Sequence, residues 1–395
     1  MPGKRAPIGQ PDRTRVLVVG QSPPLVGGIA SYVGELVSDP TVSGAVDLRT
    51  LDTPPAAGTT LGTPTRANIT RSLRHVRAVH RAARAVDVVH LNFAAAPLFP
   101  MLRATACATA ARLAGARVIL HVHTGRVAEQ CRDPRYRMLM RMAGRACARV
   151  VVLTPDDEAA LAALGINPVR LRNGVNLARF ATPRAAPSVP TLLYAGTLAA
   201  SKGLLDLRDA LRLLADRPGG PPRLQVVVVG DSRQDAPGAD ARMRRELAGC
   251  GVPVEFVGAM PRDDVRRMLT AATALCLPSH SEGAPLSVLE AMAAGVAVVA
   301  TDVGAVGEML DGGRAGYLVP ARNPRALAAA LARACTDETD RARRETCARS
   351  RVADRYDLRE TLRDVVALYE EVAATPDARR ARSRPIPRPT AYGTP

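Results

Sequence analysis

The chain contains two successive series of short apolar runs, each run followed by a segment whose apolar residues have helical spacing. Runs such as residues 16–19 and 150–153 are apolar at every position, which is typical of strands in a parallel sheet covered on both faces. The first series stops at residues 181–190, which hold three prolines, and the second starts at Thr191. The pattern predicts an α/β fold with two βαβ domains, a short linker, and a ligand crevice at the carboxyl ends of the strands.

The alternation also predicts the individual elements and their grouping. In the first half, strands are expected at residues 15–20, 45–51, 86–92, 117–122, 149–153 and 168–171, and helices at 28–37, 67–85, 101–114, 135–148 and 155–164. In the second half, strands are expected at 191–195, 223–229, 253–257, 273–277, 296–300 and 316–319, and helices at 204–215, 241–250, 262–271, 285–294, 324–335, 341–355 and 357–373. The expected division is an N-terminal extension (1–14), a first domain (15–183), a linker (184–190), a second domain (191–356), a crossover helix (357–374) and a disordered basic tail (375–395).

Length and composition exclude several classes of protein. A chain of 395 residues exceeds one ordinary hydrophobic core, and 47% hydrophobic with 23% charged residues is the composition of a globular protein. No uncharged apolar run reaches about eighteen residues and no apolar signal-peptide core is present, so neither a membrane-spanning helix nor a signal peptide is expected. The seven cysteines form no Cys-x-x-Cys pair, which favours reduced thiols and a cytoplasmic location over disulfides or zinc.

The strongest chemical signal lies in residues 279–304. An apolar strand ends in a polar loop with Glu282 and Gly283, and a helix is expected to begin at Pro285, where a missing N–H costs nothing. Free N–H groups at such a helix start bind anions. Glu282 and Glu290 would reach different parts of one extended ligand, because a carboxylate accepts the paired hydroxyl groups of sugars and ribose. A capping loop with a solvated glutamate is the alternative interpretation.

This stretch resembles the E-x7-E signature of the retaining glycosyltransferases of family 4, which have the GT-B fold. Further segments resemble the family in its own order: residues 171–180 its NGVD segment, residues 193–203 its GRLxxxKG segment, and residues 257–279 its base-binding strand-helix-strand. The resemblance covers about residues 15–373 and is stronger in the second half. It implies two Rossmann-like domains facing across a crevice, with the C-terminal helix packed back toward the N-terminal domain.

The resemblance also implies how a nucleotide diphosphate sugar would be bound as donor. Glu290 would accept ribose hydroxyl groups, and Glu282 would bind hydroxyl groups of the donor sugar. The other positions at this helix start are Gly283, Ala284, Pro285 and Leu286, and a first-domain loop adds Gly27 and Gly28, where glycine lets a phosphate approach the backbone.

Lys202 would bind the diphosphate, and it is one of only two lysines in the chain. The sequence departs from the family at Thr197, where an arginine commonly accompanies this lysine. Stabilisation of the leaving group would then depend on Lys202, on amide dipoles and on another arginine, such as Arg126 or Arg172.

Three histidines lie on strands expected to end at the crevice. His121 and His123 share one face of their strand, because strand side chains alternate. By resemblance, His123 matches the family's VH-G histidine, and it joins Glu282 and Lys202 as the predicted catalytic residues. His90 and His121 are the acceptor-side candidates, although a structural role is the usual one for a histidine in a strand.

The expected activity is therefore metal-independent transfer of a hexosyl unit, with retention, to a lipid-linked, polysaccharide or other glycan acceptor. No Asp-x-Asp, P-loop or HExxH pattern occurs, so neither a metal nor another cofactor is predicted. A nucleotide-sugar 2-epimerase of the same fold and a non-catalytic sugar- or polyanion-binding protein are the alternatives.

The net charge of +17 is concentrated in the first half, where residues 1–183 hold 24 Lys and Arg against 11 Asp and Glu. A helix with arginines at three- and four-residue steps carries part of this excess: Arg71, Arg74, Arg77, Arg81 and Arg84. It is interpreted either as a solvated face or as a surface that attracts anionic lipid headgroups at the inner membrane face or a polyprenyl-diphosphate acceptor. Nucleic acid is not expected as a partner, because aromatic residues are only 3% and tryptophan is absent.

Overall fold

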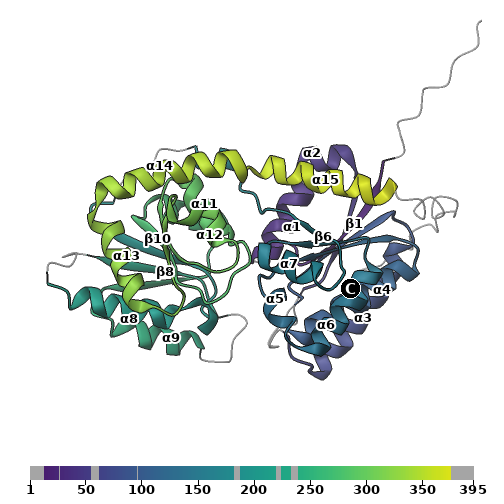
Figure 1. Cartoon of the computed structure of the whole chain (residues 1–395), viewed down its shortest axis with the longest axis horizontal. Helices are drawn as coiled ribbons and strands as arrows, with labels where there is room; N and C mark the ends of the chain where they lie inside the picture. The colour runs from purple at the N-terminus through teal and green to yellow at the C-terminus, as the bar shows by residue number, and fades with distance from the viewer. Residues whose placement is uncertain are drawn as a thin grey trace, which may run out of the picture.

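The computed structural model describes residues 13–25, 27–54, 62–95, 97–181, 187–218, 224–232 and 239–374, which form two halves with one parallel sheet each (Figure 1). The first sheet has the order β2-β1-β3-β4-β5-β6 and the second β12-β11-β10-β7-β8-β9. The first-half strands are β1 (Arg15–Gly20), β2 (Asp47–Asp52), β3 (Val88–Phe93), β4 (Arg117–Val122), β5 (Arg149–Val152) and β6 (Pro168–Arg170). The second-half strands are β7 (Thr191–Ala195), β8 (Gln225–Val229), β9 (Val254–Gly258), β10 (Ala274–Leu277), β11 (Ala297–Thr301) and β12 (Tyr317–Val319).

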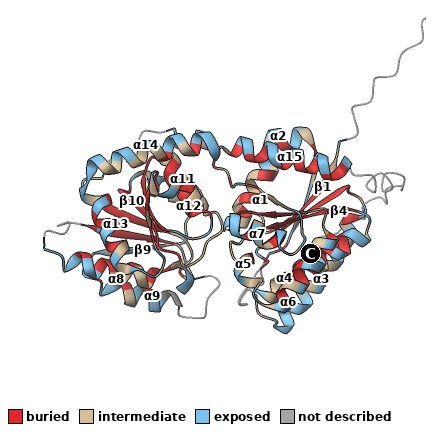
Figure 2. Cartoon of the chain, viewed as in Figure 1, coloured by how far each residue is buried: buried red, intermediate tan, exposed pale blue. Residues whose placement is uncertain are grey.

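Helices cover both faces of each sheet. The first half contains α1 (Gly28–Ser38), α2 (Pro40–Ala45), α3 (Arg66–Ala83), α4 (Leu98–Leu113), α5 (Val127–Gln130), α6 (Pro134–Ala146) and α7 (Pro155–Ala162). The second half contains α8 (Leu204–Ala215), α9 (Ala239–Ala248), α10 (Arg262–Thr270), α11 (Leu286–Ala294), α12 (Val306–Met309), α13 (Pro324–Thr336) and α14 (Glu338–Arg355), and α15 (Leu358–Ala374) follows. Each sheet therefore has a hydrophobic core on either side, and Figure 2 shows the buried strands between helices that are exposed on their outer faces.

Helix α15 returns the chain to the first half. In Figure 1, α14 and α15 run one after the other along the same side of both sheets. The N–H of Leu358 donates to the carbonyl of Val175 over 3.1 Å, and the N–H of Val175 donates to the carbonyl of Tyr356 over 2.9 Å. A Cβ atom at Gly174 would lie 2.5 Å from Cα of Leu358, so only glycine allows this crossing. Beyond it, α15 buries Leu362, Val365 and Tyr369 in the core of the first half.

Every expected strand overlaps an observed strand, and every expected helix overlaps an observed helix. The helices α2, α5 and α12 were not expected, because four to six residues are too few for a helical period to be visible. Pro285 needs a correction: its ψ of 121° is extended, so it caps α11 and the helix begins at Leu286. The tail 375–395 and most of the N-terminal extension lie outside the described residues. Among the described helices, none is long and apolar enough to span a bilayer.

Candidate active site

The loop that follows β4 in the first half contacts the loop that follows β10 in the second half. A Cβ atom added to Gly125 would lie 1.9 Å from the carbonyl oxygen of Glu282 and 2.9 Å from Cα of Gly283. Only glycine allows so close a contact. Both loops follow the carboxyl ends of parallel strands, where open α/β sheets bind their ligands. Two of the predicted catalytic residues, His123 and Glu282, therefore lie on loops whose backbones touch.

The carboxylate of Glu282 accepts two hydrogen bonds on one oxygen. Nζ of Lys202 donates to Oε1 of Glu282 over 2.7 Å, and Oγ of Ser279 donates to the same atom over 2.6 Å. Only 10% of the Glu282 side chain and 25% of the Lys202 side chain are exposed. Partial burial strengthens such a charge-assisted contact, because little water competes for it. The structure thus pairs the predicted diphosphate ligand with the predicted sugar ligand.

A tight turn places Lys202 beside this carboxylate. Lys202 ends the 3-10 helix η2 (Ala200–Lys202), and Gly203 follows with a φ of +68°. A Cβ atom at Gly203 would lie 1.8 Å from the carbonyl oxygen of Pro278, so the turn packs directly on the loop after β10. The N–H of His280 also donates to the carbonyl of Ser201 over 2.8 Å. The position of the lysine is therefore set by backbone contacts.

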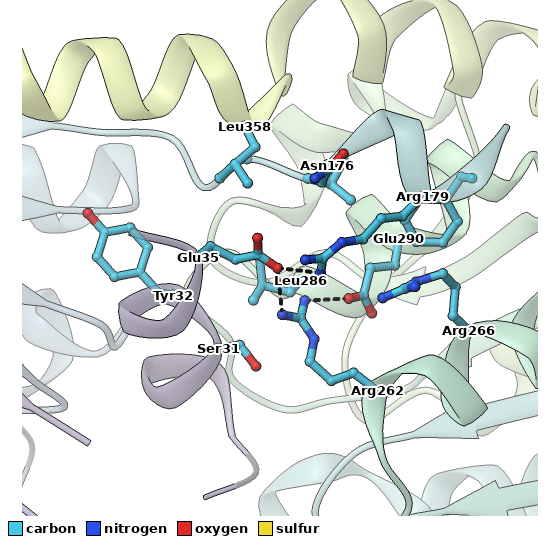
Figure 3. A pocket seen from close by; sticks show the side chains of 13 residues that line it. Ser31, Tyr32, Glu35, Asn176, Arg179, Arg262, Arg266, Leu286, Glu290 and Leu358 are labelled. Carbon is cyan, nitrogen blue, oxygen red and sulfur yellow. Dashed lines mark hydrogen bonds and ion pairs between the residues drawn. The ribbon is translucent and has the colours of Figure 1, made fainter. Parts of the chain in front are cut away.

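Glu290, the predicted ribose ligand, belongs to a charged network that joins the two halves (Figure 3). Nη2 of Arg262 donates to Oε1 of Glu290 over 2.8 Å, and Nη1 of Arg262 donates to Oε1 of Glu35 over 3.1 Å. Nη1 of Arg179 donates to the same oxygen of Glu35 over 2.6 Å. Glu35 lies on α1, across the crevice from α11. A ligand hydroxyl that binds Glu290 must therefore share this carboxylate with Arg262.

The backbone from Gly283 to Leu286 is held at the start of α11. Nδ2 of Asn173 donates to the carbonyl of Ala284 over 2.7 Å, and the N–H of Ala305 donates to the carbonyl of Gly283 over 2.8 Å. The N–H groups in the first turn of a helix have no intrahelical acceptor and lie at the positive end of its dipole. The backbone at the start of α11 is therefore held in place next to Glu282, and its positive end faces the predicted donor site.

The remaining predicted donor residues are Gly27, Gly28 and Thr197. Gly27 caps α1, and Cβ atoms at Gly27 or Gly28 would meet no atom within 4 Å, so this loop faces open space. Thr197 is half-buried, and its carbonyl accepts a hydrogen bond from the hydroxyl of Tyr194 over 2.6 Å.

The ring of His123 is held in one tautomer. Nδ2 of Asn92 donates to the carbonyl of His90 over 3.3 Å, which leaves Oδ1 of Asn92 to accept from Nε2 of His123 over 2.9 Å. Burial, followed by the influence of His90, lowers the pKa of His123 to about 3. The imidazole is therefore neutral near pH 7, with its proton on Nε2 and a lone pair on Nδ1.

The structure buries His90 and His121, each about 1% exposed. The ring of His121 stacks on those of His90 and His123, with centroids 5.5 and 3.9 Å apart, and Tyr32 packs edge-on against it. Nδ1 of His90 and the hydroxyl of Tyr369 are hydrogen bonded over 2.7 Å. Because both rings are buried, neither His90 nor His121 has an edge that a sugar acceptor could reach, and both pack in the ring cluster that includes His123.

Arg126 and Arg172 are the two candidates to replace the arginine that the family commonly has at position 197. Both already have an acidic partner. Nε and Nη2 of Arg126 both donate to the Glu129 carboxylate over 2.9 Å. Nε of Arg172 donates to Glu308 over 3.2 Å. Lys202 is thus the cation that the structure places at Glu282.

Several site residues were not anticipated. Asn173 and Ser279 lie within the conspicuous segments 171–180 and 279–304, so local sequence signals for them existed. The contact between Arg262 and Glu35 joins residues 227 positions apart, and no local pattern indicates it.

Two family models match the chain. Residues 189–337 match the family described as glycosyl transferases group 1, and residues 12–174 match the glycosyl transferase 4-like domain. Together the two matches cover most of the chain and both halves of the fold.

Two relatives illustrate the range of similar proteins. The glycogen synthase of Mycobacterium tuberculosis is 32% identical over 222 residues, which are 55% of this chain and 50% of that protein. The phosphatidyl-myo-inositol mannosyltransferase of the same species is 28% identical over 298 residues, which are 73% of this chain and 75% of that protein. The chain thus spans about half the length of the glycogen synthases that it matches.

Solved structures agree on the fold. HepE of Anabaena in complex with UDP-glucose has a TM-score of 0.70 at 16% identity, covering 91% of this chain and 100% of that one. Sucrose-phosphate synthase of Thermosynechococcus elongatus has a TM-score of 0.72 at 21% identity, covering 92% and 100%. The predicted fold class is confirmed, and the chain belongs to the group 1 glycosyl transferases of glycosyltransferase family 4, with the GT-B fold.

Proposed function

We propose that the protein is a retaining, metal-independent glycosyltransferase that moves a hexosyl unit from a nucleotide diphosphate sugar to a lipid-linked, polysaccharide or other glycan acceptor. The observation that carries this proposal is the contact of the two loops, with the Lys202–Glu282 pair on one side and His123 on the other. HepE, whose UDP-glucose complex has the same fold, supports a nucleotide-sugar donor. The mannosyltransferase among the relatives supports a lipid-linked acceptor.

Each part of the site has a role in this proposal. The start of α11, Lys202 and the loop at Gly27 and Gly28 bind the diphosphate, because amide groups and an ammonium ion stabilise its charge. Glu290 accepts the ribose hydroxyl groups while its carboxylate is shared with Arg262. Glu282 accepts hydroxyl groups of the donor sugar.

The proposed reaction needs no protein nucleophile. The bond between the anomeric carbon and the leaving phosphate oxygen breaks, and the acceptor oxygen bonds to the same face of the sugar. The acceptor proton passes to the leaving phosphate, whose growing negative charge Lys202 stabilises. His123, neutral and with a lone pair on Nδ1, accepts a hydrogen bond from a sugar hydroxyl near this centre.

The direct test is an activity assay on the purified protein. UDP-, GDP- and ADP-sugars are incubated with glycan and lipid acceptors, with and without EDTA, and nucleotide release and the anomeric configuration of the product are measured. We expect acceptor-dependent release that survives EDTA and a product of retained configuration. A strict requirement for a divalent metal, or an inverted product, contradicts the proposal. Release without an acceptor indicates the epimerase, and tight donor binding without turnover indicates a binding protein.

We extend the proposal to contact with an anionic membrane at its cytoplasmic face. On α3, the side chains of Arg74, Arg77 and Arg81 are exposed, and Leu73 beside them is 52% exposed. A surface cation contributes about 1 kcal/mol at anionic lipid. Co-sedimentation with phosphatidylcholine vesicles, with and without phosphatidylglycerol, tests the contact. We expect binding only to the anionic vesicles, and loss of it when these three arginines are replaced by glutamine.

A further inference from the structure

A cavity of about 220 Å³ lies in the first half, apart from the residues that bind the proposed donor. Its lining comes from α3, α4 and the segments that follow β1, β2 and β3. Arg71 of α3 and Arg103 of α4 both line it, together with the amides of Asn68 and Asn92. Among the described residues of this lining there is no Asp or Glu, so the cavity contains two positive charges and no negative one.

Both arginines have buried N–H donors without an acceptor. Nε and Nη1 of Arg71 and Nε of Arg103 are buried and lack a hydrogen-bond partner in the described part of the chain. Nη2 of Arg71 donates to Oδ1 of Asn68, and the guanidinium of Arg103 lies 4.9 Å from the ring centroid of Phe93. Because buried polar groups in proteins nearly always have partners, these donors indicate a ligand.

The local electrostatics agree with this geometry. Burial lowers the pKa of Arg103, and the nearby charge of Arg71 lowers it further. Burial and the same two arginines lower the pKa of His75 to about 4, so His75 is neutral near pH 7. The two guanidinium groups repel each other, and an anion with several oxygens would relieve this repulsion while accepting the unpaired donors.

The cavity also reaches the candidate active site. Asn92 lines it and accepts the hydrogen bond from Nε2 of His123 over 2.9 Å. Ile29, which lines it as well, directly follows the Gly27 and Gly28 loop. The cavity is therefore lined both by two arginines and by a residue that contacts His123.

We propose that this cavity is an acceptor subsite for a phosphate ester, with Arg71 and Arg103 binding the phosphate group. Arginine suits this role because its planar donors match phosphate oxygens in pairs. A cavity of about 220 Å³ has room for a phosphate and a small polyol attached to it. The phosphate site follows from the cavity alone, whereas its use by an acceptor, with a hydroxyl near His123, rests on the proposed transferase function.

The test is calorimetric titration of the full chain saturated with UDP, so that the start of α11 is already occupied. The probes are inorganic phosphate, glycerol 3-phosphate and water-soluble dihexanoyl phosphatidylglycerol. The proteins are the wild type, Arg71→Gln, Arg103→Gln and the control Arg112→Gln. Arg112 is exposed on α4 nine residues from Arg103, which is about two and a half turns and thus the opposite face.

We expect the wild type and Arg112→Gln to bind a phosphate ester equally, and Arg71→Gln and Arg103→Gln to bind it at least tenfold more weakly. If the wild type binds glycerol 3-phosphate but not the phospholipid, the ligand of the cavity is a soluble phosphate ester. If it also binds the phospholipid, the ligand is a lipid headgroup. Equal affinity in all four proteins, or no binding by the wild type, overturns the proposal.

Two controls separate this inference from other failures. The unfolding temperatures of Arg71→Gln and Arg103→Gln without ligand should not fall below that of Arg112→Gln, because each change removes an unpaired buried charge. If a variant loses ester binding while its unfolding temperature does not fall, misfolding is not the cause of the loss. If ester binding behaves as expected but no sugar nucleotide is a donor, the proposed function fails and the phosphate site remains.

Discussion

Nζ of Lys202 lies 2.7 Å from Oε1 of Glu282, and this ion pair joins two residues 80 positions apart in the chain. One is the proposed ligand of the diphosphate and the other of the donor sugar. A diphosphate that binds Lys202 therefore releases the carboxylate of Glu282 to accept sugar hydroxyl groups. We expect the diphosphate of the donor to bind Lys202 and the sugar of the donor to bind Glu282.

Replacing Lys202 by alanine should weaken binding of the free nucleoside diphosphate and lower turnover. A charge-assisted contact contributes about 1.5–3 kcal/mol, which corresponds to roughly ten- to hundredfold. Calorimetry with UDP and GDP measures the affinity, and the double variant with Glu282→Gln separates the lost contact from the unpaired carboxylate. Unchanged nucleotide affinity in Lys202→Ala would refute the assignment.

Thr197→Arg should tighten nucleotide binding and make it more sensitive to salt. Arg126 and Arg172 are already paired with Glu129 and Glu308. An arginine at position 197 would therefore add a positive charge to the diphosphate site that neither of them supplies. Affinity for UDP at low and high salt concentration is the measurement. Weaker binding at low salt would mean that the site already holds enough positive charge.

The two glutamates should separate into different kinetic roles. Glu290→Gln should chiefly weaken nucleotide affinity, because a ribose contact is the same in the ground state and the transition state. Glu282→Gln should chiefly lower turnover, because it contacts the sugar whose charge changes. Steady-state kinetics together with UDP titration distinguish them, and equal effects of both variants on UDP binding would contradict this division.

Gly125→Ala should lower turnover by about 10²-fold, because the new Cβ would force apart the loops that hold His123 and Glu282. The matched control is Gly44→Ala on α2, where a Cβ meets no atom within 4 Å. Turnover and unfolding temperature are measured for both. An active Gly125→Ala enzyme would show that the loop contact is dispensable.

Acid should destabilise the first half through its buried histidines. Burial lowers the pKa of His90 and of His123 to about 3, against an ordinary value of 6.5. As the pH falls from about 6.5 toward 3, the unfolded chain takes up protons that the folded chain does not, so the free energy of unfolding decreases. One such histidine contributes up to about 1.4 kcal/mol per pH unit.

Thermal unfolding across this pH range measures the effect. The pKa of His121 is also lowered by burial, so His121→Leu, of similar volume, should lose less stability on acidification than the wild type. Parallel curves for the two proteins would show that His121 does not take part.

The sequence by itself determined the two series of strands and helices, and the position of the loop and helix start at residues 283–286. Burial of a strand on both faces requires a local apolar run, and a proline after a glycine loop favours a helix start, so both signals are visible within a few residues. Short elements such as α2 and α5 offer too few residues for a period, and their existence was not predictable.

Only the tertiary structure decided which charged groups meet and which do not. The pairs Lys202–Glu282 and Arg262–Glu35 join loops and helices of different sequence regions, while Arg71 and Arg103 come together without a carboxylate. An arginine on a helix looks the same in the sequence whether its neighbour across the fold is an acid, another arginine or water. Local periodicity specifies which face of each element is buried, but the distance between two side chains on different elements is set by how the sheets and the crossing helices α14 and α15 pack together.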